Sequence, residues 1–198
     1  FGKWHLGRVS PGKHGFDYHD GTTENHGPGE SKDPNPKDVF GITERAIDFL
    51  AGQVQAGRPF YLQLSHYAVH GPAEALQASI NRFEKLPAGR RHSNSEYAAM
   101  TYDLDTAVGA LLEKVDELGI ADNTYVVLMS DNGAPVGRRT SRVSQNTPLA
   151  NGKGTFYEGG IRVPLMVRGP GIKANTFCGV SVAGYDLLPP FCELASVR

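Results

Sequence analysis

The chain has 198 residues, of which 39% are apolar, and its 20 basic and 21 acidic residues give a formal net charge of −1. This length suits one domain, or one domain with a piece of another, and the near-neutral charge gives no reason to expect nucleic acid or an anionic membrane as a partner. The longest apolar run, near residues 125–129, is too short to span a bilayer.

Residues 10–38 are rich in Gly, Pro, His and Asp, and they show neither helical nor strand periodicity. This composition predicts a long loop. The loop carries His14, His19 and His26. These side chains could be solvated or could bind a metal, and an aperiodic loop favours solvated histidines.

The spacing of apolar residues then predicts a helix over 39–55, with Asp38 as its N-cap and Gly57 after its end. The apolar face of this helix comprises Ile42, Ala46, Ile47, Leu50 and Val54. A short buried strand is predicted at 60–64, and a weaker helix at 75–86.

The strongest helical pattern covers Ser95–Leu118, and Gly119 follows it as a natural C-terminal cap. Two further apolar runs, Tyr125–Met129 and Leu165–Arg168, predict strands, the first of them buried on both faces. Strands that alternate with helices are typical of an α/β fold. We therefore expect one mostly parallel sheet flanked by helices.

Two oxygen-bearing side chains, Asp131 and Asn132, follow the strand at 125–129. Sites in parallel α/β sheets form beyond the carboxyl ends of the strands, and hard oxygen donors suit Ca²⁺ or Mg²⁺. Asp-Asn-Gly is also good turn chemistry, so a simple turn is an equal alternative. Two donors cannot complete a Ca²⁺ shell of about six to eight oxygens, so a metal would need further ligands.

Four basic side chains occupy similar places. Lys3 and His5 are one residue apart in "FGKWHLG", and alternate residues of an extended segment point to the same side, which would suit an anion. His70 follows the predicted strand at 60–64, and Lys153 lies in the glycine-dense "NGKGTFYEGG". Taken alone, Lys3 and His5 could belong to a frayed terminus, His70 could be a structural histidine, and Lys153 could be a solvated loop lysine. Their joint position at strand ends favours one site at the carboxyl edge of the sheet.

Four segments in this order resemble the arylsulfatase family of the alkaline-phosphatase-like superfamily: "GKWHLG", "PFYLQLSHYAVHGP", "YAAMTYDLDTAVGALLEKVDELGIADNTYVVLMSDNG" and "GKGTFYEGGIRVPLMVRGPG". The resemblance extends to "GYDLLPPFCELA", nearly the whole chain. It implies an alkaline-phosphatase-like α/β fold and hydrolysis of sulfuric esters.

The resemblance also implies roles for single residues. Lys3 and His5 match the lysine and histidine that face the family's nucleophile. His70 matches the histidine that contacts the sulfate and the leaving oxygen, and Lys153 matches the lysine that bridges them. His66 matches no catalytic position of the family.

Asp131 and Asn132 match the later pair of calcium ligands, so the resemblance implies Ca²⁺, with Mg²⁺ possible. The family's nucleophile is a formylglycine made from a C/S-x-P-x-R motif upstream of "GKWHLG", and an Asp-Asp pair completes its metal site. Neither the motif nor the Asp-Asp pair is in this sequence. Cys178 is followed by "GVS" and Cys192 by "ELA", so neither cysteine fits the motif. We therefore expect residues 1–198 to be a partial sulfatase catalytic domain that lacks the nucleophile segment and a C-terminal subdomain. Alone, this chain should bind a divalent cation weakly and should not turn over a sulfate ester.

The implied partner is a sulfated small molecule or a sulfated carbohydrate. Arg138, Arg139 and Arg142 could read further anionic groups on such a sugar or could form a solvated basic loop. The resemblance favours a periplasmic or secreted location. Two alternatives stay open: a phosphate or phosphonate ester hydrolase of the same superfamily, and a non-catalytic remnant that binds sulfated glycans.

Overall fold

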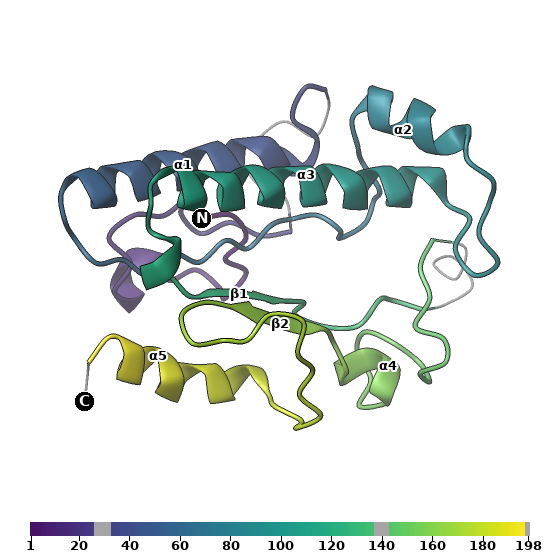
Figure 1. Cartoon of the computed structure of the whole chain (residues 1–198). Helices are drawn as coiled ribbons and strands as arrows, with labels where there is room; N and C mark the ends of the chain where they lie inside the picture. Colours follow the sequence, from purple (N-terminus) through teal and green to yellow (C-terminus); the bar gives the residue numbers. More distant parts are fainter. Residues whose placement is uncertain (26–32, 137–142, 197–198) are drawn as a thin grey trace.

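The computed structural model describes residues 1–25, 33–136 and 143–196. The helices are α1 (Val39–Gln55), α2 (Gln77–Glu84), α3 (Ser95–Glu117), α4 (Glu158–Ile161) and α5 (Leu188–Leu194). The strands are β1 (Val126–Met129) and β2 (Leu165–Arg168), and short 3₁₀ turns include η1 (Pro11–His14) and η2 (Pro36–Asp38). Figure 1 shows α1 and α3 side by side on one side of the small sheet and α5 on the other.

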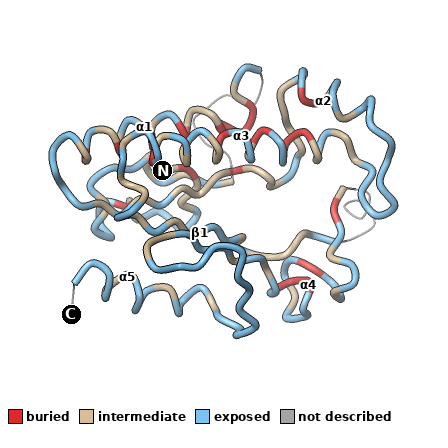
Figure 2. The backbone as a smooth tube through the Cα atoms, in the orientation of Figure 1, coloured by how far each residue is buried: buried red, intermediate tan, exposed pale blue. Residues whose placement is uncertain are grey.

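The core of the described chain lies between α1 and α3 (Figure 2). Its buried apolar side chains are Val39, Ile42, Ala46 and Leu50 on α1, with Ala99, Met100, Ala107 and Val115 on α3. The helix predicted at 39–55 is therefore confirmed, and the predicted apolar stripe supplies its buried face. Burial of a Leu, Ile or Met side chain stabilises the fold by about 2 kcal/mol.

The N-terminus of α1 is capped by Asn35 instead of Asp38. The Asn35 Oδ1 accepts hydrogen bonds from the backbone N–H groups of Phe40 (3.0 Å) and Gly41 (3.2 Å). Asp38 has a left-handed backbone (φ 52°) and makes no side-chain cap; its carboxylate accepts from Arg45 Nη2 at 2.8 Å instead. The predicted cap is wrong because the turn before the helix directs this carboxylate to an arginine.

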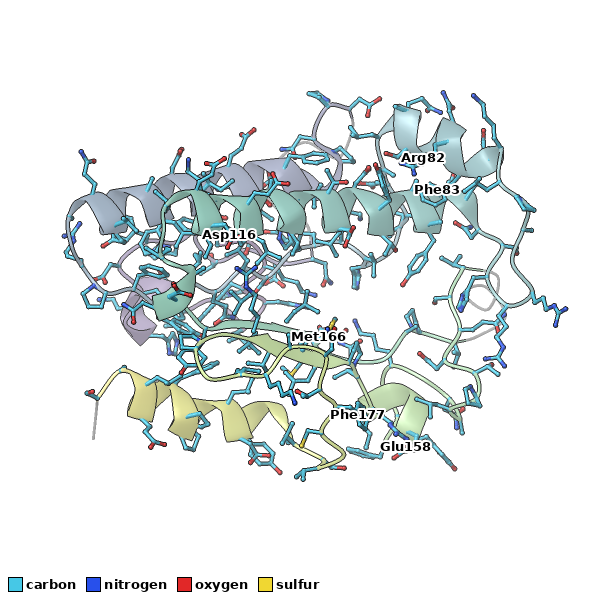
Figure 3. All side chains as sticks on the ribbon, in the orientation of Figure 1. Arg82, Phe83, Asp116, Glu158, Met166 and Phe177 are labelled. Atoms are coloured by element: carbon cyan, nitrogen blue, oxygen red, sulfur yellow. The ribbon has the colours of Figure 1, made fainter. Side chains whose placement is uncertain are left out.

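A buried carboxylate joins α2 to α3. Asp103 accepts hydrogen bonds from the Ser79 hydroxyl (2.5 Å) and from the backbone N–H of Leu76 (2.7 Å). On the outer side of the same contact, the Arg82 guanidinium lies 4.5 Å from the centre of the Tyr102 ring (Figure 3 labels Arg82 and Phe83). The helices predicted at 75–86 and 95–118 are confirmed with slightly shorter ends.

The two strands pair in an antiparallel arrangement, with Val126 opposite Arg168 and Met129 opposite Leu165. The prediction that these strands run parallel is wrong. A parallel pair needs a crossover of a dozen or more residues that is usually a helix. Of the connection from β1 to β2, the described residues contain only the single turn of α4, so no long crossover helix is found among them.

The predicted strand at 60–64 is not a regular strand in the structure, but it lies beside the N-terminal segment. Gly2 and Ser65 form a parallel bridge, and the Lys3 N–H donates to the Ser65 carbonyl at 2.7 Å. Only glycine fits at position 2, because its φ is +91° and a Cβ there would lie 2.3 Å from the Ser65 oxygen. The α/β class is thus confirmed, with a parallel bridge here and an antiparallel pair at β1–β2.

The described sheet is exposed. Leu128 is 41% exposed and Met166 58% exposed, so the prediction that the strand at 125–129 is buried on both faces is wrong for the described residues. An ion pair between Asp116 on α3 and Arg168 on β2 links the sheet to the helix layer, and Phe177 lies on the far side of the sheet from α3 (Figure 3). No helix in the described ranges has the length and apolar character to cross a membrane.

Candidate functional site

The pKa of the His70 imidazole depends on burial and on charges from distant parts of the chain. Burial lowers the pKa of His70 below its ordinary value, and the charges of Lys153, Lys3 and Lys37 lower this pKa further. The hydrogen bond of the ring to the Gly71 carbonyl works in the opposite direction. The charges of Lys3 and Lys153 thus reach His70, and the convergence of these three residues on one site stays a prediction.

The orientation of the His70 ring follows from its backbone partner. The Nδ1–H donates to the carbonyl of Gly71 at 2.8 Å, so the other ring nitrogen, Nε2, carries the lone pair when the ring is neutral. The lowered pKa favours that neutral form at pH 7. In its neutral form, His70 therefore offers an acceptor nitrogen at Nε2.

Asp131 and Asn132 follow β1 in a tight bend that packs on α4. The Ser130 hydroxyl donates to the Asn132 carbonyl at 2.9 Å, and the Gly133 N–H donates to the Gly160 carbonyl at 2.9 Å. The contact leaves no space for a side chain, since a Cβ on Gly133 would lie 1.8 Å from the Gly159 oxygen. This contact fixes the bend that carries the predicted oxygen donors.

The loop of Lys153 is joined to the same bend. The Lys153 N–H donates to the Ala134 carbonyl at 3.2 Å. The Asn146 Oδ1 accepts from the Ala134 N–H at 3.0 Å. The Asn146 Nδ2 donates to the Ala134 carbonyl at 2.8 Å and to the Asn151 carbonyl at 2.9 Å. The glycine-dense stretch therefore approaches other backbone closely, as its composition predicts, and it places Lys153 next to the segment that follows Asp131.

The oxygen donors fit one side of a site for a hard cation. The Asp131 carboxylate is exposed and forms no ion pair within the described residues. Across 1–25, 33–136 and 143–196, no three His, Cys, Asp or Glu side chains are grouped so that they could hold a metal ion. Asp131 and Asn132 have the right donor chemistry but supply only part of a Ca²⁺ shell.

His5 does not share an extended segment with Lys3. Its φ is +48°, so the backbone turns at this residue and the alternation rule does not apply. The His5 N–H donates to the Thr23 carbonyl at 2.7 Å, and its Nε2 lies 3.1 Å from a carboxylate oxygen of Glu24. The prediction that Lys3 and His5 point to the same side assumed an extended backbone, and the backbone at His5 is not extended. The Glu24 carboxylate orients the His5 ring instead.

The other histidines of the N-terminal loop have different partners. His14 packs against the Trp4 ring, with ring centres 5.4 Å apart, and the Nδ1 of His19 accepts from the Gly21 N–H at 3.1 Å. His26 and the three arginines of the loop after "SDNG", Arg138, Arg139 and Arg142, lie outside the described residues. His66 is partly buried, and its Nδ1 is a buried atom with no hydrogen-bond partner within the described residues.

Burial lowers the pKa of His66 from 6.5 to about 4, which makes stability depend on pH. The unfolded chain binds a proton near pH 6.5 and the folded chain does not, so the free energy of unfolding should fall as the pH falls through this range. We expect a loss of about 2 kcal/mol between pH 7 and pH 5, measured by urea denaturation. His66→Gln should reduce this slope, whereas His92→Gln, at an exposed site, should keep it. An unchanged slope in His66→Gln would contradict the assignment.

The sequence interpretation missed two residues of this region, Lys37 and Glu74. Lys37 is buried in the turn η2, and a carboxylate oxygen of Glu74 lies 3.7 Å from its Nζ. A lysine before an amphipathic helix normally points to solvent, so no local pattern indicates its burial.

A profile of the sulfatase family matches residues 1–189. The chain belongs to the sulfatase family. Human arylsulfatase A is 33% identical over 150 residues, which cover 76% of this chain and 28% of that protein. Canine (Canis lupus familiaris) N-acetylgalactosamine-6-sulfatase is 30% identical over 202 residues, which cover 86% of this chain and 37% of that protein. This sulfatase chain thus spans about a third of the length of these curated relatives.

Solved sulfatase structures have the same fold. The crystal structure of Ps i-CgsB in complex with k-i-k-neocarrahexaose aligns with a TM-score of 0.72 and 33% identity over 81% of this chain and 34% of that one. The PsFucS1 sulfatase from Pseudoalteromonas sp. aligns with a TM-score of 0.69 over 91% of this chain and 33% of that one, at 22% identity, and so bears on the fold alone. The predicted alkaline-phosphatase-like fold of this sulfatase is confirmed.

Proposed function

We propose that the protein that contains this chain hydrolyses sulfate esters. The observation that supports this most is the match of the sulfatase family to residues 1–189. The charges of Lys3 and Lys153, which both lower the pKa of His70, and the bond of the Lys153 N–H to Ala134 agree with it. A sulfate ester gathers negative charge on its oxygens and on the leaving oxygen in the transition state. Fixed cations at that position stabilise this charge more than they stabilise the substrate.

Each residue then has a chemical task. Lys3 and Lys153 bind sulfate oxygens. A bound anion raises the pKa of a neighbouring imidazole, so His70 takes up a proton when the substrate binds and gives it to the leaving oxygen. His5, oriented by Glu24, acts as a base when sulfate is released.

Asp131 and Asn132 would hold one side of a divalent cation, Ca²⁺ in our proposal, with Mg²⁺ as the alternative. This ion would neutralise charge on the sulfate oxygens. The nucleophile would be the family's formylglycine, supplied from outside these 198 residues. The residues described here therefore bind and orient the ester and move the proton.

A sulfated carbohydrate is the proposed substrate class. The support comes from the relatives named N-acetylgalactosamine-6-sulfatase and from Ps i-CgsB, whose structure holds an oligosaccharide. Sugar substrates need polar contacts beyond the sulfate. These contacts would involve the edge of the molecule formed by the Lys153 loop and the Asp131–Asn132 bend.

The test compares ester hydrolysis by the full-length protein, matured to carry its formylglycine and supplied with Ca²⁺. We expect turnover of 4-nitrophenyl sulfate to exceed that of 4-nitrophenyl phosphate, and a chelator should abolish it until Ca²⁺ or Mg²⁺ is restored. A preference for the phosphate ester would favour the phosphohydrolase alternative. Binding of inorganic sulfate without turnover of any sulfate ester would indicate a non-catalytic protein.

A further inference from the structure

The segment 20–24 lies against the first residues of the chain, and one of its side chains bonds the backbone on both sides of Lys3. The Thr23 hydroxyl donates to the Gly2 carbonyl at 2.7 Å and accepts from the Trp4 N–H at 2.8 Å. These two groups belong to the two peptide units that flank the Lys3 Cα. A hydroxyl can donate and accept at once, so the single Thr23 side chain holds both units.

A different segment holds the other edge of Lys3. The Lys3 N–H donates to the Ser65 carbonyl at 2.7 Å, and the Ser65 N–H donates to the Phe1 carbonyl at 3.0 Å. Because peptide units are planar, fixing the two units around a residue fixes its φ and ψ. Thr23 and Ser65 together therefore set the direction in which the Lys3 side chain leaves the backbone.

The segment 20–24 is itself anchored to the helix layer. The Asp20 carboxylate accepts from the Gly2 N–H at 2.8 Å. It also accepts two hydrogen bonds from Arg45 of α1, from Nε at 3.1 Å and from Nη2 at 2.8 Å. The Asp20 side chain is only 9% exposed, and paired, charge-assisted hydrogen bonds of this kind are among the stronger ones in proteins. Thr23 is therefore held against a core helix, which gives the backbone of Lys3 a rigid support.

We propose that Thr23 is a positioning residue of the sulfate site, whose hydroxyl fixes the backbone of Lys3 so that the Lys3 ammonium group meets the sulfate oxygens in a defined place. The inference rests on the proposed function, in which Lys3 binds sulfate, and it adds a residue that acts through Lys3 without touching the substrate. A charge that is held in place before the reaction stabilises a transition state more than one that must first be ordered. A displacement of about 1 Å can lower the rate about 100-fold.

Thr23→Val tests the proposal, because valine has nearly the shape of threonine and lacks the hydroxyl. In the full-length, matured protein with Ca²⁺, it should lower kcat/KM for 4-nitrophenyl sulfate about 10-fold and raise the Kd for inorganic sulfate about threefold. Hydrogen exchange of the Trp4 N–H should become faster, because this group loses its acceptor. Thr23→Ser keeps the hydroxyl and should keep the native values. Thr22→Val, at the exposed neighbouring threonine, is the matched control and should also keep them.

A double-mutant cycle with Lys3 separates positioning from a general structural role. Lys3→Met removes the charge that Thr23 is proposed to place, so adding Thr23→Val to Lys3→Met should change kcat/KM and the sulfate Kd by less than about twofold. Equal losses with and without Lys3 would show that Thr23 acts on the whole fold, and this result would overturn the proposal. Native values in Thr23→Val would overturn it as well. If Thr23→Val does not fold, the smaller Thr23→Ala replaces it in the cycle.

The outcomes also separate this inference from the proposed function. Coupling between Thr23 and Lys3 in the binding of inorganic sulfate, by a protein that turns over no sulfate ester, would support the positioning role and contradict catalysis. Normal turnover of 4-nitrophenyl sulfate without such coupling would contradict the role of Thr23 alone. A sulfate Kd that Lys3→Met leaves unchanged would place Lys3 outside the site and overturn the inference.

Discussion

Replacement of Lys153 by methionine is expected to lower kcat/KM for a sulfate ester by about 100- to 1,000-fold. The reason is electrostatic. The charge of Lys153 lowers the pKa of His70, and the Lys153 loop is bonded to the bend of Asp131 through Ala134. Without this cation, charge on the sulfate oxygens in the transition state loses a fixed partner. Methionine keeps most of the length of the side chain, so packing changes little.

Two further measurements make this prediction specific. The pKa of His70 should rise in Lys153→Met, since the lysine charge lowers it in the native protein. Lys173→Met is the matched control, because Lys173 is an exposed lysine in the loop after β2 and should keep both the activity and the His70 pKa. Equal activity in the two variants would show that Lys153 does not contact the reacting group.

Replacement of Gly133 by alanine should have the largest effect on stability, a loss of about 2–4 kcal/mol in the free energy of unfolding. The new Cβ would lie 1.8 Å from the backbone oxygen of Gly159, and a backbone atom cannot rotate away as a side chain does. The two segments must separate, which breaks the hydrogen bond from Gly133 to Gly160 and moves the neighbouring Asp131–Asn132 pair.

Urea denaturation and activity together test this expectation. Gly52→Ala is the control, because Gly52 is an exposed glycine of α1 and a Cβ added to it would meet no neighbouring side chain or loop within 4 Å. Alanine there should stabilise the helix by about 0.5–1 kcal/mol. A Gly133→Ala protein as stable and active as the native one would mean that the bend does not pack on α4 as described.

The helices follow from the sequence because their signal is local. The stripe that includes Ile42 and Leu50 predicts α1 over 39–55, and the structure has the same limits. The sheet depends on contacts between distant segments, which local periodicity does not contain. The run at 165–168 is a strand as predicted, but its direction relative to β1 depends on the connection between them.

The candidate site could be predicted in part for the same reason. His70, Asp131 and Lys153 follow apolar runs or glycine-rich turns, so a rule about strand ends predicts that they lie together, and this stays a prediction. Lys37 obeys no such rule, because its burial depends on a left-handed turn and on Glu74, far along the chain. The cap of α1 illustrates the same limit, since the choice of Asn35 over Asp38 depends on where Arg45 lies.

The connections around His70 also bear on the order of folding. The helix layer forms within residues 35–117, whereas the site needs Lys3 bonded beside Ser65 and the Lys153 loop bonded beside Ala134. Closing such long loops is entropically costly, so we expect these contacts to form late, after the transition state for folding. The proposed ligand, sulfate, would bind only the assembled site, and it would then stabilise the native state by slowing its unfolding, with little effect on the rate at which the chain folds.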